Sequence, residues 1–154
     1  MPRAVLPLAG WCEYVHLPEL GIGPLLAKLD TGARSAALHA ENMTVYLSDN
    51  QRRIRFDVPA ETGSHQVKRC DLALADARRV RNAGGRSELR HVVETRIQLG
   101  QSDWVSHITL TDRTDMGAPM LLGRSTLRDR FLIHPGRSFL LTRTQAAFHK
   151  PKTS

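Results

Sequence analysis

Apolar and polar residues alternate along much of the chain, with the period of two that is typical of β-strands. In residues 53–58, for example, Ile54, Phe56 and Val58 fall on one face. Clusters of turn-forming Asn, Asp, Gly, Pro and Ser separate the alternating segments. The predicted strands with this pattern are residues 43–47, 53–58, 66–74, 91–99, 104–110 and 138–142.

One segment near the C-terminal end predicts a helix instead. Ser125 is a suitable N-cap for residues 126–131, in which Leu127 and Phe131 lie four positions apart on one side. A helix this short needs packing against the rest of the protein in order to form. The whole pattern therefore predicts one all-β barrel or sandwich with a single short helix near its C-terminal end.

The composition fits one small domain. The chain has 154 residues, of which 41% are hydrophobic and 5% aromatic, so aliphatic side chains must fill the core. No apolar run approaches the roughly 18 residues that a membrane-spanning helix needs. Cys12 and Cys70 are the only cysteines, which argues against a disulfide scaffold or a cysteine-rich zinc module. We expect a cytoplasmic protein whose two thiols are reduced.

The chain is basic, because 22 Lys and Arg against 15 Asp and Glu give a net charge of +7. A basic surface attracts polyanions such as nucleic acid, an anionic membrane surface or an acidic peptide, although it can also be a merely solvated face. The sequence has no aromatic stacking motif and no helix-turn-helix, which disfavours nucleic acid. It has no GxxxxGK[ST] phosphate loop, so we expect no bound ATP and no other cofactor.

The candidate chemistry begins where a mostly apolar strand, residues 25–29, leads into Asp30-Thr31-Gly32. This arrangement places a carboxylate on a rigid element rather than on a mobile loop, which suits catalysis. Gly32 permits backbone conformations that other residues avoid, and Thr31 can hydrogen-bond to nearby backbone. Alone, the tripeptide is also an ordinary turn.

A second motif lies far downstream, at Leu121-Leu122-Gly123-Arg124. The two motifs together resemble the retropepsin-like aspartic proteases. The segments 10–15, 17–22, 30–40 and 110–113 are similar to one bacterial branch, the "ATP-dependent zinc protease" or RimB-type family associated with RimK-type ATP-grasp glutamate ligases. The likeness covers residues 10–143, which leaves 1–9 as an N-terminal extension and 144–154 as a flexible C-terminal tail.

The resemblance implies a closed β-barrel of the acid protease fold and an aspartic peptidase activity. Such an enzyme needs two carboxylates that share one proton, since like charges set close together do not both ionise readily. The chain holds one Asp-Thr-Gly, and we interpret residues 115–117 as a loop. We therefore expect a C2 homodimer in which Asp30, Thr31 and Gly32 of each copy form the catalytic centre.

The resemblance also assigns supporting and substrate-binding residues. Leu121, Leu122, Gly123 and Arg124 are expected to support the active-site loop. A flap is expected at residues 78–92. This region is basic, because residues 78–96 contain six arginines and only two glutamates. Most retropepsins carry a second Asp where this chain has Arg34, which leaves the partner of Arg124 open. The expected substrate-binding residues are Ala33, Arg34, Arg81, Gly84, Gly85 and Arg86.

An acidic or oligoglutamate peptide, or a glutamylated protein, explains both the basic flap and the net charge, because arginine binds carboxylates through two parallel hydrogen bonds. A glutamate ligase is the further partner that the resemblance implies, and no membrane is expected. The seven histidines are widely spaced and form no HExxH motif, so we expect no metal. The alternative is a non-catalytic basic module that binds an acidic or ribosomal partner.

Overall fold

The computed structural model describes residues 5–81, 84–113 and 117–142. The whole expected C-terminal tail, 144–154, and residues 1–4 of the expected extension, 1–9, lie outside these ranges. The strands are β1 (Leu8–Gly10), β2 (Cys12–Leu17), β3 (Ile22–Leu29), β4 (Ala36–His39), β5 (Glu41–Ser48), β6 (Gln51–Pro59), β7 (Val67–Ala73), β8 (Asp76–Arg81), β9 (Ser87–Leu99), β10 (Ser102–Thr111), β11 (Met120–Leu122) and β12 (Leu132–His134). The helical turns are η1 (Pro18–Leu20) and α1 (Arg124–Leu127), and no helix in the described ranges is long and apolar enough to cross a membrane.

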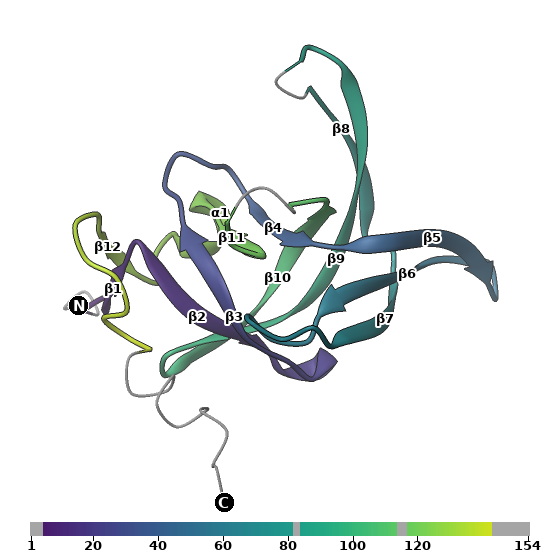
Figure 1. The fold of residues 1–154 in the computed structure, drawn as a ribbon. Coiled ribbons are helices and arrows are strands. Elements are labelled where there is room, and N and C mark those ends of the chain that lie inside the picture. The colour runs from purple at the N-terminus through teal and green to yellow at the C-terminus, as the bar shows by residue number, and fades with distance from the viewer. Residues whose placement is uncertain (1–4, 82–83, 114–116, 143–154) are drawn as a thin grey trace, which may run out of the picture.

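Six strands form a closed barrel (Figure 1). They pair in the order β10-β4-β11-β3-β2-β9, and the antiparallel pairing of β9 with β10 closes the ring. Aliphatic side chains fill the interior, among them the fully buried Leu25, Leu38, Ile97 and Ile108. The prediction of an all-β, retropepsin-like closed barrel with one short helix is confirmed.

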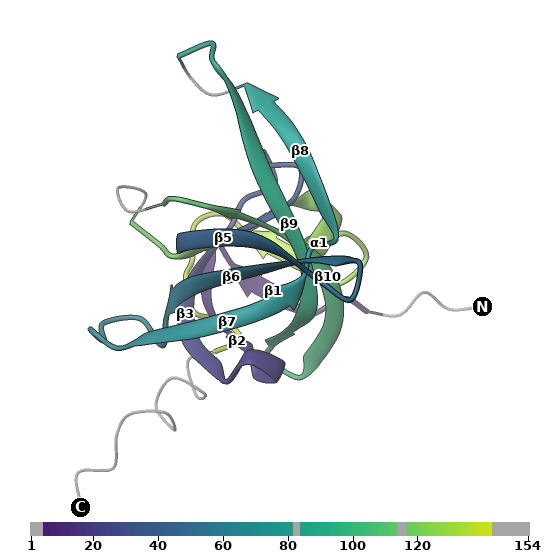
Figure 2. The same ribbon diagram turned by 90° about the vertical axis from the view of Figure 1, so that its right-hand side faces the viewer.

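Strand β8 continues the sheet beyond the ring by pairing with β9, and this β8–β9 hairpin projects away from the barrel (Figure 2). Strands β5, β6 and β7 form a separate antiparallel sheet. As predicted, Ile54, Phe56 and Val58 of β6 share one face, and all three are buried in the common core. The opposite face of this sheet carries polar and charged side chains.

The predicted strand at 138–142 is wrong. The segment follows β12, which pairs in parallel with β1, but the segment itself joins no sheet. Its backbone N–H groups instead donate to the fully buried carboxylate of Glu13: Leu140 at 2.9 Å, Leu141 at 3.1 Å and Thr142 at 3.0 Å. A side chain therefore satisfies the donors that a neighbouring strand would otherwise take.

The predicted helix begins later than the observed one. Helix α1 spans Arg124–Leu127 with Gly123 as its N-cap, and Ser125 lies inside the first turn. The first N–H groups of the helix are satisfied by carbonyls of the loop after β3, because Arg124 N–H donates to Ala33 and Ser125 N–H donates to Arg34. Leu127 and Phe131 are both buried.

Candidate active site

The connection between β3 and β4 starts at Asp30 and passes over the end of β11. Strand β11 lies between β3 and β4 in the barrel, parallel to β3 and antiparallel to β4. A tight hairpin therefore cannot join β3 to β4 (Figure 1). The loop crosses Gly123, whose backbone it contacts. This topology presents residues 30–35 at the surface of the barrel and brings the two motifs together.

Asp30 is oriented by its own backbone surroundings. Its N–H donates to the Leu122 carbonyl at 2.9 Å, and its carbonyl accepts the Ala33 N–H at 3.2 Å. The N–H of Gly32 donates to Oδ1 of Asp30 at 2.8 Å. A Cβ atom at position 32 would lie 3.1 Å from that oxygen. The turn thus holds the Asp30 carboxylate while Asp30, Thr31 and Gly32 all remain exposed.

Gly123 is required by close backbone contact. A Cβ atom at this position would lie 2.6 Å from the Ser35 carbonyl oxygen, 2.7 Å from the Ser35 nitrogen and 2.8 Å from the Ala33 carbonyl oxygen. Real Cβ atoms do not approach backbone atoms so closely, and backbone cannot rotate aside as a side chain can. The loop after Asp30 therefore packs directly on the Gly123 backbone.

Arg124 finds a partner in the loop itself. Its Nη1 donates to the Thr31 carbonyl at 3.0 Å. The position that holds an acid in most retropepsins is Arg34 here, and a backbone carbonyl accepts the Arg124 hydrogen bond instead. Leu122 is buried below the loop, and Leu121 is half-buried. The structure thus brings Leu122, Gly123 and Arg124 against the Asp30 loop, while Leu121 pairs with Lys28 and Ala37 in the barrel.

An apolar groove of about 660 Å³ extends from the loop along α1 to β12. Thr31, Arg34 and Arg124 line one end, and Phe131, Leu132 and Ile133 line the other. Leu132 is 55% exposed, and Leu8, its partner in the β1–β12 pair, is 46% exposed. The active-site loop therefore borders a hydrophobic surface.

A basic cavity of about 570 Å³ lies beside the loop, where Ala33, Ala37 and Leu121 form part of its wall. Of the residues the structure describes, none that lines it is acidic. Its arginines are Arg34, Arg78, Arg79, Arg81, Arg90 and Arg113.

The flap residues are divided between this cavity and the hairpin tip. The β8–β9 hairpin pairs Arg81 with Ser87 across its end. Arg81 lines the basic cavity, whereas Gly84, Gly85 and Arg86 lie beyond the last pair of the hairpin, in the loop that joins its strands. Residues 82–83, which the predicted flap also includes, lie outside the described ranges.

The expected substrate-binding residues include neither Arg90, which falls within the predicted flap at 78–92, nor Arg113. Arg113 is only 7% exposed, and burial lowers the pKa of its guanidinium, as does the nearby Arg90, while Asp30 acts in the opposite direction. Arg113 is therefore within electrostatic range of both the loop carboxylate and a second arginine. Arg113 lies two residues after the end of β10. The sequence alone does not show that this position is close to the active-site loop, because the closeness depends on the pairing of β10 with β4.

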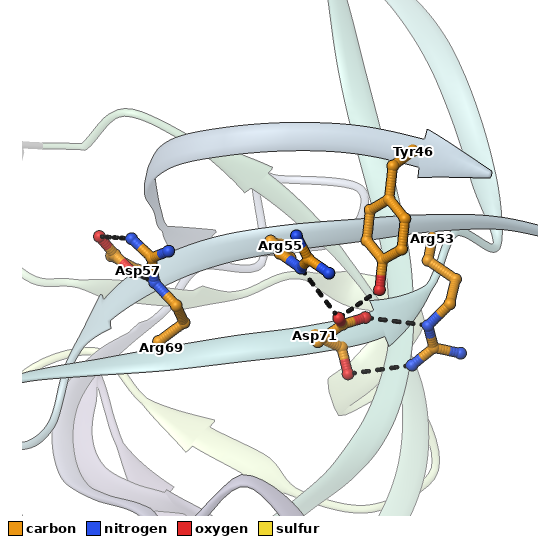
Figure 3. Close-up of polar contacts among 6 residues, drawn as sticks. All are labelled: Tyr46, Arg53, Arg55, Asp57, Arg69 and Asp71. Atoms are coloured by element: carbon orange, nitrogen blue, oxygen red, sulfur yellow. Dashed lines mark hydrogen bonds and ion pairs between the residues drawn. The ribbon is translucent and has the colours of Figure 1, made fainter. Parts of the chain in front are cut away.

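A second group of arginines lies on the polar face of the β5–β6–β7 sheet (Figure 3). Asp71 accepts hydrogen bonds from Tyr46, from Arg53 Nε at 2.9 Å and from Arg55 Nε at 3.3 Å. These partners hold the pKa of Asp71 below its usual range, with the Tyr46 hydrogen bond the largest cause. Asp57 is similarly bound by Asn42 and Arg69. Both aspartates of this polar face thus pair with arginines of the same sheet.

The residues present do not fit a zinc site. Within 5–81, 84–113 and 117–142, no three His, Cys, Asp or Glu side chains are grouped so that they could hold a metal ion.

Comparison with known proteins identifies the family. The sequence model of the family described as RimB-like, "Retropepsin-like aspartic endopeptidase RimB", matches residues 8–144. A protein of Legionella pneumophila, Lpg0085, whose function is described as unknown, has a similar crystal structure, with a TM-score of 0.74 and 29% identity. The match covers 88% of this chain and 98% of that protein.

Curated relatives carry a different name. Proteins of Shewanella pealeana, Desulfotalea psychrophila and Parasynechococcus marenigrum, each named "Probable alpha-L-glutamate ligase", are 34%, 36% and 37% identical to this chain. The matches cover 85%, 81% and 87% of the chain but only 28%, 26% and 29% of those proteins. The chain thus spans less than a third of the length of the relatives it matches.

Proposed function

The chain belongs to the retropepsin-like aspartic endopeptidase family RimB, and from this premise we propose that it is a peptidase active as a homodimer. The Asp30 carboxylates of two copies form the catalytic pair. The observation that carries the proposal is the Asp30 loop, which is fixed by backbone contacts to β11 and α1 yet leaves its carboxylate exposed. An acid built so rigidly into an exposed turn fits a role toward a group outside its own subunit.

The apolar groove beside the loop supports the dimer. It brings Thr31 and the exposed β12 residue Leu132 onto one surface, so a second copy that covers the groove also brings its own Asp30 close. A two-stranded sheet such as β1–β12 is marginal in isolation, and pairing with the same strands of a partner would stabilise it. The symmetric arrangement requires the same patch on both subunits.

The pair would act on a peptide bond through one water molecule. One carboxylate is ionised and removes a proton from the water while the water oxygen attacks the carbonyl carbon of the peptide. The other carboxyl group is protonated and donates a hydrogen bond to the carbonyl oxygen, as in other aspartic proteases. The C–N bond then breaks, and the leaving amine takes the proton that the first carboxylate had removed from the water, which restores the pair. The Gly32 N–H stabilises the carboxylate oxygen that it contacts.

An acidic peptide is the substrate class that the electrostatics favour. The cavity beside the loop contains six arginines and no acidic residue among those described, so it attracts carboxylates. The relatives named as glutamate ligases contain a segment similar to this chain, which supports α-linked glutamate chains as substrates and a glutamate ligase as a partner.

The test is incubation with α-linked oligoglutamate followed by mass spectrometry. We expect the wild type to shorten the chains. We expect Asp30→Asn to do so at a rate reduced by at least about 10³-fold, since each subunit then lacks its ionisable group in the pair. Asp49→Asn is the matched control. It makes the same chemical change at an exposed residue in the turn between β5 and β6. Equal cleavage by wild type and Asp30→Asn would contradict the proposal.

The second candidate is a basic binding module, which the arginine cavity alone would support. Wild-type protein that binds oligoglutamate but never shortens it, at any pH between about 4 and 8, would favour this module over the peptidase.

A further inference from the structure

Two arginines, Arg90 on β9 and Arg113 after β10, line the basic cavity: Arg113 is buried, and Arg90 is 29% exposed but has a buried Nε. Arg113 is held by its backbone, whose N–H donates to His39 Nδ1 at 2.8 Å, and by its Nε, which donates to the Ala118 carbonyl at 3.3 Å. The Nε of Arg90 is buried and has no hydrogen-bond partner among the described residues. Glu88 forms an ion pair with Arg90, at 3.7 Å from its Nη2, but Glu88 is 44% exposed and leaves the buried Nε without an acceptor.

The two guanidinium groups lie close enough to repel each other. The charge on Arg90 lowers the pKa of Arg113, second only to burial as a cause. Burying one cation beside another is costly, and so is a buried N–H donor without an acceptor. Both costs fall when an anion that accepts several hydrogen bonds enters the cavity.

We propose that Arg90 and Arg113 form a subsite for one side-chain carboxylate of the bound peptide, next to the bond that Asp30 attacks. The identity of the ligand as a peptide rests on the proposed function. A carboxylate has two oxygens with four acceptor positions, which suits two arginine forks better than one. The cavity volume of about 570 Å³ leaves room for a glutamyl side chain.

This assignment differs from one in which the exposed arginines select the substrate. Arg34, Arg79 and Arg81 are exposed, so their attraction for a peptide is screened by salt and mainly speeds its approach. Arg113 and the Nε of Arg90 are shielded from water, so a carboxylate bound to them is held by stronger hydrogen bonds. This pair therefore decides whether a glutamate is preferred to a glutamine.

The experiment measures binding rather than cleavage, in the Asp30→Asn background, by fluorescence anisotropy. The probes are labelled α-linked pentaglutamate and pentaglutamine. We expect tighter binding of pentaglutamate, and about a tenfold or greater loss of that preference when Arg90→Gln is added. Arg52→Gln is the matched control. This substitution removes the same charge from an exposed position on β6 that does not line the cavity. We expect it to change the preference by less than about twofold at physiological salt.

An unchanged preference in Arg90→Gln, or the same small effect in Arg90→Gln and Arg52→Gln, would overturn the subsite. If Arg90→Gln does not fold, Arg90→Lys decides, since it keeps the charge and loses the planar fork: reduced preference supports the subsite, and full preference contradicts it. This binding result does not depend on catalysis. If Arg90→Gln loses the preference for pentaglutamate but the wild type cleaves neither peptide, only the peptidase proposal is refuted. If the wild type cleaves pentaglutamate and pentaglutamine equally well, only the subsite is refuted.

Discussion

The Asp30 loop and the β5–β6–β7 sheet both carry charged side chains, but they are stabilised differently. The loop is held by backbone: Asp30, Ala33 and Arg34 exchange hydrogen bonds with residues 122–125, and the Gly123 backbone packs directly against it. The sheet matches its charges across its strands, as Asp71 does with Arg53 and Arg55 (Figure 3).

This difference separates a surface that is complete from one that needs a ligand. Where Arg69 faces Asp57 and Arg53 faces Asp71, each cation already has its anion. Beside the Asp30 loop, backbone contacts fix the geometry. Among the described residues the cavity there is lined by six arginines and no acid, and only Arg78 and Arg90 pair with acids outside it, Asp76 and Glu88. A cluster of arginines alone therefore does not identify a binding site, whereas an excess of arginines over acids does.

The largest effect is expected where backbone meets backbone, at Gly123. The Gly123→Ala variant places a Cβ atom 2.6 Å from the Ser35 carbonyl oxygen, so the loop must move. We expect the free energy of unfolding to fall by about 3 kcal/mol, and activity to be lost even in the folded fraction. Urea denaturation monitored by circular dichroism measures the change.

The control for Gly123 is Gly63, between β6 and β7, where a Cβ atom would meet nothing within 4 Å but φ is +84°. Gly63→Ala should cost only about 1 kcal/mol, from the backbone conformation alone. Equal losses in the two variants would show that close packing at Gly123 is not the cause.

Glu13 sharpens the comparison, because it is an acid like Asp71 but fully buried, and its donors are mostly backbone N–H groups. It accepts from Gly10 N–H at 2.7 Å, from the N–H groups of residues 140–142 and from Thr142 Oγ1 at 2.7 Å. In Glu13→Gln an NH₂ group would face these donors. We expect a loss of about 2–3 kcal/mol in the free energy of unfolding, measured by urea denaturation; a loss below about 0.5 kcal/mol would contradict the assigned role.

Asp71 is expected to make the free energy of unfolding depend on pH. Its pKa is lowered in the folded protein by Tyr46, Arg53 and Arg55, so unfolded chains bind the proton at higher pH than folded ones. Its stabilising contribution is therefore present above the unfolded pKa of about 3.9 and is lost as the pH falls further. The difference in stability between wild type and Asp71→Asn should shrink from pH 5 to pH 3, as followed by urea denaturation; a constant difference would argue against the Asp71 network.

The smallest effect concerns Cys70, which faces the core from β7. Burial raises the pKa of its thiol to about 11. Only the thiolate reacts, so alkylation at pH 8 should be about 100-fold slower in the folded protein than in urea. Mass spectrometry of the labelled peptides separates Cys70 from Cys12, and equally fast labelling in both states would show that the thiol is accessible.

The sequence predicts those elements whose residues alternate over a long stretch, such as β6, β9 and β10. Three-residue strands such as β1, β11 and β12 leave too short a pattern to be recognised. Residues 138–142 alternate like a strand, but Glu13 takes their N–H groups, and a pattern cannot reveal a partner about 127 positions away.

The two motifs locate the Asp30 loop from sequence, yet the reason that Gly123 must be glycine becomes visible only when β11 is placed between β3 and β4. The same holds for Arg90 and Arg113. They are separated along the chain, and only the pairing of β9 with β10 and of β10 with β4 brings them to one cavity.

The central claim, that two copies supply one Asp30 each to a single site, is tested most directly by mixing subunits. Wild-type protein is equilibrated with an about ninefold excess of Asp30→Asn, and oligoglutamate cleavage is measured at constant wild-type concentration. If both carboxylates are needed, most wild-type subunits are trapped in inactive mixed dimers, and the activity falls about tenfold. Activity that stays unchanged, while mixed dimers are shown to form, would mean that each subunit acts alone and would contradict the shared site.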